Sequence, residues 1–165
     1  MNKELQDQLL QILASNKDRI FRICRSHCSE TEEAKDLFQD VVFNLWKSLP
    51  SFNNESNINT WVYRITLNVC IRSKQRSIRK ESKLIRLDSI YYENIAEPAH
   101  HDALEKLQKL NQCIYKLEET DKSIILLHLE ELPYKEIAQI TGLTENHVAV
   151  KIKRIKEKLF TCIST

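Results

Sequence analysis

The chain has 165 residues, 42% of them hydrophobic, and a formal net charge of +2, which is enough apolar content for one ordinary domain or two small ones. This composition excludes a disordered tail, and three prolines, one glycine and the lack of long alternating Val/Ile/Thr runs argue against a β-rich fold. No apolar run approaches the roughly 18 residues that span a bilayer, and the N-terminal MNKELQDQLLQ is too polar for a secretory signal. We therefore predict an all-helical, cytoplasmic protein with no segment inserted in a membrane.

Apolar residues at helical spacing predict helices throughout the first half of the chain. Residues 3–28 are expected to form one or two amphipathic helices, and residues 30–49 another helix that ends at Pro50. The loop SFNNESN follows, rich in turn-forming Asn and Ser, and a further helix is expected from about Ile58. These elements are predicted to form an N-terminal domain of residues 1–76.

A second helical domain is predicted after a flexible linker. Helical periodicity fades across residues 77–103, which include Pro98, so this stretch is expected to connect two domains. The patterning resumes in residues 104–165, where Thr120 is expected to cap the helix DKSIILLHLEEL. The predicted fold class is therefore all-α, with two small helical domains.

The stretch PYKEIAQITGLTENHVAVKIKRIKEKL, residues 133–159, predicts a helix-turn-helix in the second domain. It contains Gly142, the only glycine of the chain, which allows a left-handed corner between two helices. Thr144 is a suitable N-cap for the second helix. The apolar face of that helix recurs at spacings of four, three and four, in Val148, Ile152, Ile155 and Leu159.

Charged residues are segregated into blocks, although the net charge is small. Residues 64–86 contain eight Lys or Arg and one acid, and residues 151–158 contain five basic residues and one acid. Either block could follow the phosphates of a nucleic acid or form a solvated helix face. Residues 29–40, SETEEAKDLFQD, carry five acids and one lysine, which would repel DNA and suit a basic protein partner.

The second helix of a helix-turn-helix enters the major groove of duplex DNA. The residues off its apolar face are Glu145, Asn146, His147, Val150, Lys151 and Arg154. Arg and Lys pair with guanine, Asn with adenine, and Glu accepts a hydrogen bond from cytosine, so this set could contact bases as well as phosphates. A domain of this pattern can also pack its helices without binding DNA.

The helix after the Asn-rich loop has the composition of a single-stranded DNA site. It combines aromatic and basic side chains in Trp61, Tyr63, Arg64, Asn68 and Arg72. The alternative is that the two tryptophans of the chain are simply core residues. We favour this alternative for Trp46, in the preceding helix, and leave it open for Trp61.

The five cysteines, at positions 24, 28, 70, 113 and 162, are odd in number and lack a paired framework, so reduced thiols are predicted rather than disulfides. Cys24, His27 and Cys28 could share one side of a helix and offer three zinc ligands. Small buried thiols are the more common arrangement, however, and no fourth ligand is apparent. We therefore predict no metal, no cofactor and, since clustered carboxylates are also lacking, no enzymatic activity on nucleic acid.

Three motifs resemble a known family. DLFQDVVFNLWKSLPSF and NTWVYRITLNVCIRSKQR in the first domain, with LPYKEIAQITGLTENHVAVKIKRIKEKL in the second, resemble the sigma factors of bacterial RNA polymerase, in their compact two-domain extracytoplasmic function (ECF) group. By this resemblance residues 1–76 correspond to region two and residues 104–160 to region four. The resemblance implies a non-catalytic subunit that directs promoter-specific initiation of transcription.

The same resemblance implies a role for each candidate residue. The acidic helix would bind the β′ coiled coil of core polymerase through Asp36, Gln39, Asp40 and Asn44. The loop would capture a flipped base of the minus-ten element through Phe52, Asn53, Asn54 and Glu55, and the next helix would hold the melted strand through Trp61, Arg64, Asn68, Arg72 and Arg76. Region four would contact the β flap and read the minus-thirty-five element as duplex through Thr144, Glu145, Asn146, His147, Lys151, Lys153 and Arg154.

The resemblance also implies a further protein partner, and the sequence departs from the family pattern at two positions. Relatives are commonly restrained by an anti-sigma protein, often membrane-bound, and one is expected here. Val42 stands where many relatives have phenylalanine and Val150 where a polar residue is usual, so no base preference is carried over. The main alternative function is a helix-turn-helix regulator that binds duplex DNA without polymerase. That alternative explains residues 104–160 but gives the acidic helix and the Trp61 helix no role.

Overall fold

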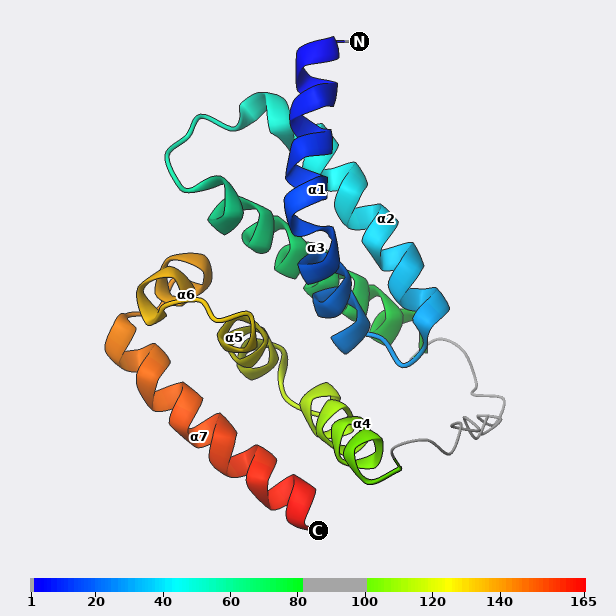
Figure 1. The fold of residues 1–165 in the computed structure, drawn as a ribbon, viewed down its shortest axis with the longest axis vertical. Helices are drawn as coiled ribbons and strands as arrows, with labels where there is room; N and C mark the ends of the chain where they lie inside the picture. Colours follow the sequence, from blue (N-terminus) through cyan, green and yellow to red (C-terminus); the bar gives the residue numbers. More distant parts are fainter. Residues whose placement is uncertain (1, 82–100) are drawn as a thin grey trace.

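The computed structural model describes residues 2–81 and 101–165, and over these ranges it is helical with no strand (Figure 1). The first range holds α1 (Lys3–Ser26), α2 (Thr31–Ser48), the short 3-10 helix η1 (Leu49–Ser51) and α3 (Ile58–Glu81). The second range holds α4 (His101–Tyr115), α5 (Glu119–Leu129), α6 (Tyr134–Thr141) and α7 (Glu145–Ser164). The predicted all-α fold class is confirmed.

Helices α1, α2 and α3 pack against one another as a three-helix bundle. The first is one continuous helix, and its N-cap Asn2 accepts a hydrogen bond from the backbone N–H of Glu4 at 3.2 Å. Pro50 lies in η1, directly after α2, as expected of a residue that cannot continue a helix. The buried side chains that join the three helices include Ile20, Ile23, Val41, Leu45 and Val62.

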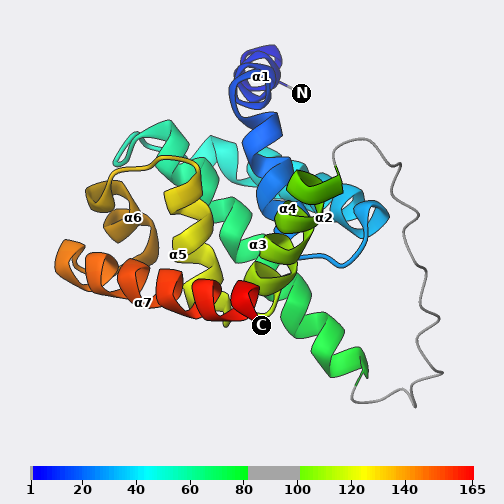
Figure 2. The same cartoon turned by 60° about the horizontal axis from the view of Figure 1, so that its bottom comes forward.

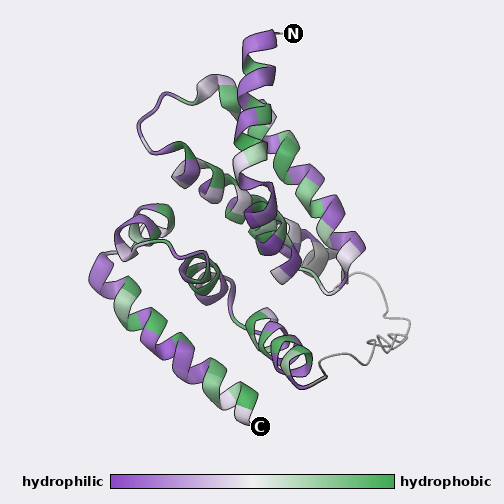
Figure 3. Ribbon diagram, in the orientation of Figure 1, coloured by the Kyte–Doolittle hydropathy of each residue, from purple (hydrophilic) through white to green (hydrophobic). Residues whose placement is uncertain are grey.

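In the second group α4, α5 and α6 all pack against α7. Its core includes the buried side chains Ile124, Leu127, Ile137, Ile152 and Ile155. Figure 3 shows hydrophobic and hydrophilic residues alternating along α2 and α7, as expected of helices that bury one face. The apolar side of α4 is only partly covered, since Ile114 is buried but Leu104 and Leu107 remain 41% and 53% exposed.

Two predicted boundaries require correction. Helix α5 begins at Glu119 with Glu118 as its N-cap, so Thr120 lies inside the first turn and does not cap the helix. Helix α3 continues to Glu81 and α4 begins at His101, so the predicted linker of residues 77–103 is helical at both ends. Figure 2 shows the end of α3 projecting past its neighbours, and a helix that leaves its bundle needs no continuous apolar face. Pro98 lies outside the described residues.

The two groups of helices lie side by side. Helix α3 contacts α6, and α1 contacts α4, as Figures 1 and 2 show from two directions. The loop after η1 and the helix-turn-helix are therefore close in space, although about 80 residues separate them in sequence.

Candidate nucleic-acid interface

A pocket of about 560 Å³ lies where the Asn-rich loop meets the start of α3. The rings of Phe52 and Trp61, both half-buried, lie 5.0 Å apart between centroids with an interplanar angle of 42°. The pocket is lined by Ser51, Phe52, Asn53, Glu55, Ser56, Asn57, Trp61, Arg64 and Gln139. Aromatic surfaces beside amide and charged groups are the combination that binds an unstacked nucleobase.

The shape of the loop is set by its own asparagines. Asn53 donates from Nδ2 to Glu55 Oε1 at 2.8 Å, and its Oδ1 accepts from the backbone N–H of Glu55 at 3.4 Å. Asn54 has a φ of 60°, a left-handed conformation that Asn tolerates better than most residues. Asn57 accepts from the backbone N–H of Asn59 at 2.9 Å and so caps the first turn of α3.

The exposed side of α3 carries the basic residues that the sequence predicted. Arg64, Asn68, Arg72 and Arg76 are all exposed and recur every four residues, which places them on one face. Arg72 donates from Nε to the backbone oxygen of Asn68 at 3.3 Å. Arg64 donates from Nη2 to the backbone oxygen of Gln139 at 2.8 Å, so the second group of helices already holds this side chain.

Tyr63 does not belong to this surface. Its side chain is only 2% exposed, and its hydroxyl accepts a hydrogen bond from Arg19 Nη1 at 3.3 Å. The predicted contribution of the Tyr63 ring to single-stranded DNA binding is therefore wrong, because position 63 faces α1 within the bundle. Trp61, in contrast, lines the pocket.

The helix-turn-helix is present where the sequence predicted it. Helix α6 ends at Gly142, whose φ of 78° forms the left-handed corner, and the Thr144 hydroxyl accepts from the backbone N–H of His147 at 3.1 Å. A Cβ at position 142 would meet nothing within 4 Å, so only the backbone conformation requires glycine there. The candidate residues exposed on α7 are Glu145, Asn146, His147, Lys153 and Arg154.

Lys151 is less accessible than its place on the predicted reading helix suggests. Its Nζ lies 3.2 Å from Oδ1 of Asp121, and Nζ of Lys158 lies 2.8 Å from the other oxygen of the same carboxylate. Burial alone would raise the pKa of Asp121, but the hydrogen bonds from Lys158 and Lys151 lower it. Sequence reasoning missed Asp121, since it lies on α5, 30 residues before Lys151.

The acidic face of α2 is turned to solvent. Asp36, Gln39 and Asp40 are exposed, while Asn44 is half-buried and donates from Nδ2 to the backbone oxygen of Asp40 at 2.8 Å. Phe43, 63% exposed, adds an apolar ring to this helix. Sequence reasoning assigned Phe43 no role, although an apolar residue between two polar candidates was visible there.

The possible zinc ligands do not converge. Nδ1 of His27 lies 3.1 Å from Oε2 of Glu119 on α5, and burial lowers the pKa of this histidine. Burial also raises the pKa of the Cys28 thiol to about 11, which disfavours the thiolate that binds metals. Among the described residues no group of three or more His, Cys, Asp or Glu could hold a metal ion.

Two family models match the chain. Sigma-70 region 2 matches residues 12–83, which include the acidic helix, the pocket and the basic face of α3, and sigma-70 region 4 matches residues 107–159, which include the helix-turn-helix. The chain belongs to the sigma-70 family. As a sigma factor it directs transcription by RNA polymerase.

A curated relative places the sigma factor in the ECF group. This chain is 27% identical over 164 residues to the ECF RNA polymerase sigma factor SigW of Bacillus subtilis, and the match covers 93% of this chain and 88% of SigW. The expected family and group are confirmed.

Two solved structures share the fold of the sigma factor. The sigma factor RpoE in complex with the anti-sigma factor NepR from Bartonella quintana is 19% identical with a TM-score of 0.66, and the match covers 99% of both chains. CnrH in complex with the cytosolic domain of CnrY is 21% identical with a TM-score of 0.68, covering 96% of this chain and 89% of CnrH. In the described ranges of the sigma factor, no helix has the length and apolar character to cross a membrane.

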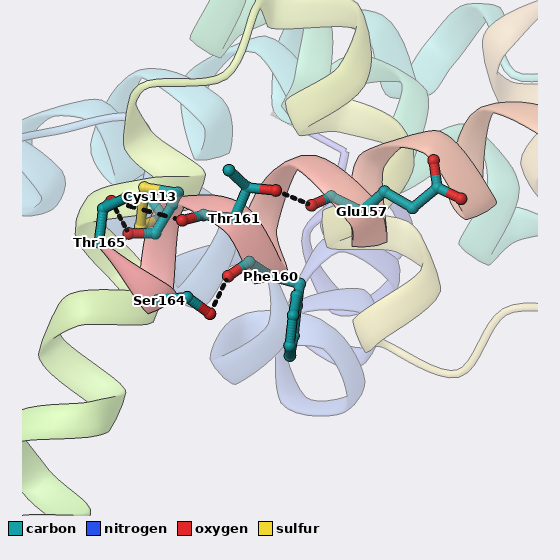
Figure 4. The surroundings of a disulfide bond; sticks show 7 residues. Cys113, Glu157, Phe160, Thr161, Ser164 and Thr165 are labelled. Atoms are coloured by element: carbon teal, nitrogen blue, oxygen red, sulfur yellow. Dashed lines mark hydrogen bonds between the residues drawn. A yellow bond between two sulfur atoms is a disulfide. The ribbon is translucent and has the colours of Figure 1, made fainter.

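The prediction that all five cysteines are reduced is wrong for two of them. Cys113 of α4 and Cys162 of α7 form a disulfide, with their Cα atoms 6.0 Å apart, and Figure 4 shows this bond near the C-terminal end of α7. Cys24, Cys28 and Cys70 are free thiols. The pairing was not visible in the sequence because the two cysteines are 49 positions apart and meet only when α4 packs against α7.

Proposed function

We propose that this sigma factor binds core RNA polymerase, recognises the minus-ten element as melted single strand and recognises the minus-thirty-five element as duplex. The observation that carries the proposal is the Phe52–Trp61 pocket, which lies directly beside the exposed basic face of α3. An aromatic pocket next to a row of cations suits one displaced base and the phosphates that follow it.

The two groups of helices are proposed to have separate roles. Residues 1–76 act as region two, which binds polymerase and melts the minus-ten element, and residues 104–165 act as region four, with residues 77–103 as the linker. The matches of the two family models to residues 12–83 and 107–159 support this division.

In region two, a base flipped out of the minus-ten element enters the pocket between Phe52 and Trp61. The side chains of Asn53, Asn54 and Glu55 are exposed on the same loop and offer hydrogen bonds to its edge. Stacking contributes about 1–3 kcal/mol per base, while unstacking costs about a few kcal/mol. Melting therefore depends on polymerase and on region four acting together with the pocket.

In region four, α7 lies in the major groove of the minus-thirty-five element. Glu145, Asn146 and His147 stand at its exposed N-terminal end, where a reading helix meets the bases. Lys153 and Arg154 contact phosphates, and the Thr144 hydroxyl acts mainly as the cap of the helix. Because Lys151 is paired with Asp121, its contribution requires that pair to separate.

The proposed protein partners are core polymerase and an anti-sigma factor. Asp36, Gln39, Asp40 and Asn44 of α2 bind the β′ coiled coil, and region four binds the β flap. Both solved structures named above are complexes, one with the anti-sigma factor NepR and the other with the cytosolic domain of CnrY, which supports a comparable protein partner here. The sigma factor contributes binding and orientation, and the proposal assigns it no catalytic residue and no cofactor.

Transcription in vitro tests the proposal. Core polymerase is incubated with fragmented host genomic DNA, with and without the sigma factor, and the transcript starts are sequenced. We expect discrete new starts that share two upstream elements at a fixed separation, one read as duplex and one captured as single strand. If the protein binds duplex DNA but yields no new starts with active polymerase, a conventional helix-turn-helix regulator becomes the better reading.

A charge reversal on α2 separates these two functions. Asp40→Lys places a cation on the proposed polymerase surface and should abolish polymerase binding, measured by co-migration in gel filtration, while duplex binding persists. Asp7→Lys is the matched control, since it makes the same charge change on an exposed part of α1. Equal polymerase binding by both variants would contradict the role of α2.

A further inference from the structure

A buried asparagine interrupts the apolar face of α1. The residues that this face buries recur at spacings of four, four and three, and they are Ile12, Asn16, Ile20 and Ile23. Asn16 is only 3% exposed. An amide at such a position costs free energy unless it is hydrogen-bonded, whereas an apolar side chain there would add to the core. The position of Asn16 is therefore explained by its hydrogen bonds and not by apolar packing.

The amide of Asn16 joins α1 to the first turn of α3. Its Nδ2 donates to the backbone oxygen of Ile12 at 3.1 Å and to Oδ1 of Asn59 at 3.3 Å, which uses both amide hydrogens. The first bond lies within α1, whereas the second reaches a residue 43 positions later. A buried group of α1 thus holds a residue at the start of α3.

A second hydrogen bond crosses the same helix pair one turn further on. Nη1 of Arg19 donates to the hydroxyl of the buried Tyr63 at 3.3 Å. Arg19 follows Asn16 by three residues on α1, and Tyr63 follows Asn59 by four on α3, so the two bonds lie one above the other. A shift of α3 along α1 would break both. Buried polar contacts of this kind fix the register of packed helices, which apolar contacts alone specify less strictly.

The first turn of α3 is also where the Asn-rich loop ends. Asn57 caps this turn, since its Oδ1 accepts from the backbone N–H of Asn59 and its backbone oxygen accepts from the N–H of Trp61 at 3.1 Å. Asn57 and Trp61 both line the pocket. Asn59 therefore connects the buried Asn16 to the wall of the pocket.

The other end of the loop is held against α1 as well. The short helix η1 contacts α1, and its first residue, Leu49, is buried. The backbone N–H of Phe52 donates to the backbone oxygen of Leu49 at 3.1 Å. The two rings of the pocket, Phe52 and Trp61, thus come from segments that both pack against α1. Their separation depends on where the start of α3 lies relative to η1.

We propose that Asn16 is a positioning residue for the melted strand, because its hydrogen bond to Asn59 fixes the start of α3 and with it the place of Trp61. This inference rests on the proposed function, since it takes the Phe52–Trp61 pocket as the site of the flipped base. Asn16 itself lies too deep to contact DNA. Its loss should leave duplex binding unchanged and weaken capture of the base, because stacking requires both rings at the correct separation.

Acrylamide quenching of Trp61 tests the positioning in the full chain without DNA. Trp46→Phe removes the only other tryptophan, so the emission reports Trp61 alone. Asn16→Leu replaces the amide by an apolar group of the same branched shape. Ile20→Val is the matched control, since it weakens the same buried face of α1 and keeps the hydrogen bond. We expect a larger quenching constant in Asn16→Leu than in Ile20→Val, and equal constants would overturn the inference.

Asn59→Ala removes the same hydrogen bond from its exposed partner. If Asn16→Leu loses its helical circular dichroism, Asn59→Ala decides the question. If both fold, the double variant should have the quenching constant of either single variant, because the two residues act through one bond. Asn59→Asp keeps the acceptor oxygen and should match wild type. Additive effects of the two single variants would contradict the inference.

The rate of promoter opening tests the consequence for function. Holoenzyme is combined with a promoter that the transcription experiment above has mapped, and the lag before steady transcription is measured against holoenzyme concentration. This dependence separates duplex binding from opening. We expect Asn16→Leu to slow opening about fivefold, the effect of about one hydrogen bond, with duplex binding unchanged. Equal opening rates of Asn16→Leu and Ile20→Val would show that Asn16 is an ordinary core residue.

The two measurements distinguish this inference from the proposed function. If wild type gives no new starts, the proposed function fails, and the quenching of Trp61 alone decides whether Asn16 positions the loop. If wild type initiates and Asn16→Leu matches Ile20→Val in both measurements, only the role of Asn16 is overturned.

Discussion

Two carboxylates at the start of α5, Glu119 and Asp121, hold cations that come from distant parts of the chain. Glu119 contacts Lys74 and His27 of region two, whereas Asp121 contacts two lysines of α7. Both lie in the first turn of α5, where carboxylates are favoured by the helix dipole. Glu119 thus connects the two regions, and Asp121 helps to orient the proposed reading helix.

The charge of Glu119 makes stability depend on pH in a definite direction. Burial would raise its pKa, but the neighbouring His27 and Lys74 outweigh burial and lower the pKa from 4.5 to about 2. The stabilisation is therefore present above about pH 4.5 and is lost as the pH falls towards about 2. The variant Glu119→Gln should have a lower free energy of unfolding than wild type near pH 7. This difference in free energy should shrink as the pH falls.

Urea unfolding at a series of pH values measures this difference, and Glu157→Gln, at an exposed position on α7, serves as the control. A difference between Glu119→Gln and wild type that stays constant down to about pH 2 would contradict the lowered pKa.

Asp121→Asn should change how duplex binding depends on salt. The substitution releases Lys151 and Lys158 from their shared carboxylate, so both become available to phosphates. We expect the slope of log affinity against log salt to become steeper by about one to two. Fluorescence anisotropy with a mixed-sequence duplex at several salt concentrations gives the slope, and an unchanged slope would show that neither lysine reaches the DNA.

At the scale of secondary-structure elements, the helix-turn-helix depends on one backbone conformation. The corner between α6 and α7 requires a φ of 78° at Gly142, and the cap at Thr144 starts the next helix two residues later. The turn between α6 and α7 is therefore set by backbone geometry and a local cap, while packing against α4, α5 and α6 holds the rest of α7 in place.

Gly142→Ala should destabilise the protein by about 1–2 kcal/mol, since a Cβ strains the left-handed conformation although the space for it is open. Gly142→Asn should lose less, because Asn tolerates this conformation. Urea denaturation followed by circular dichroism measures both. Equal stability of the alanine variant and wild type would show that the corner adjusts its backbone.

At the scale of the whole molecule, α4 and α7 are held together covalently as well as by packing. The Cys113–Cys162 disulfide closes a loop that contains α5 and α6, the elements that contact region two and precede the proposed reading helix. The bond therefore joins the first helix of region four covalently to its last helix.

Cys162→Ala should lower the free energy of unfolding by about 2–4 kcal/mol, because the bond restricts the unfolded chain. Dithiothreitol should destabilise the wild type by a similar amount and leave the variant unchanged. Thermal melting with and without the reductant measures this, with Cys28→Ala, at a free thiol, as the control. A wild type insensitive to reductant would show that the bond contributes little to stability.

The sequence by itself determined the features that depend on neighbours along the chain. The all-α class, the stop after α2, the Gly142 corner and the Thr144 cap follow from apolar spacing, proline, a left-handed residue and a local hydrogen bond, all of which act within a few residues. The exposed basic residues of α3 were predictable for the same reason, because the helical repeat places them on one face of the helix.

Only the tertiary structure decided the contacts between distant segments. Arg64 meets Gln139 across 75 residues, Cys113 meets Cys162 across 49, and Lys151 meets Asp121 across 30. No periodicity encodes such pairs, because each forms only when packed helices bring two surfaces together. The same packing buried Tyr63 and placed a residue of the helix-turn-helix in the wall of the Phe52–Trp61 pocket.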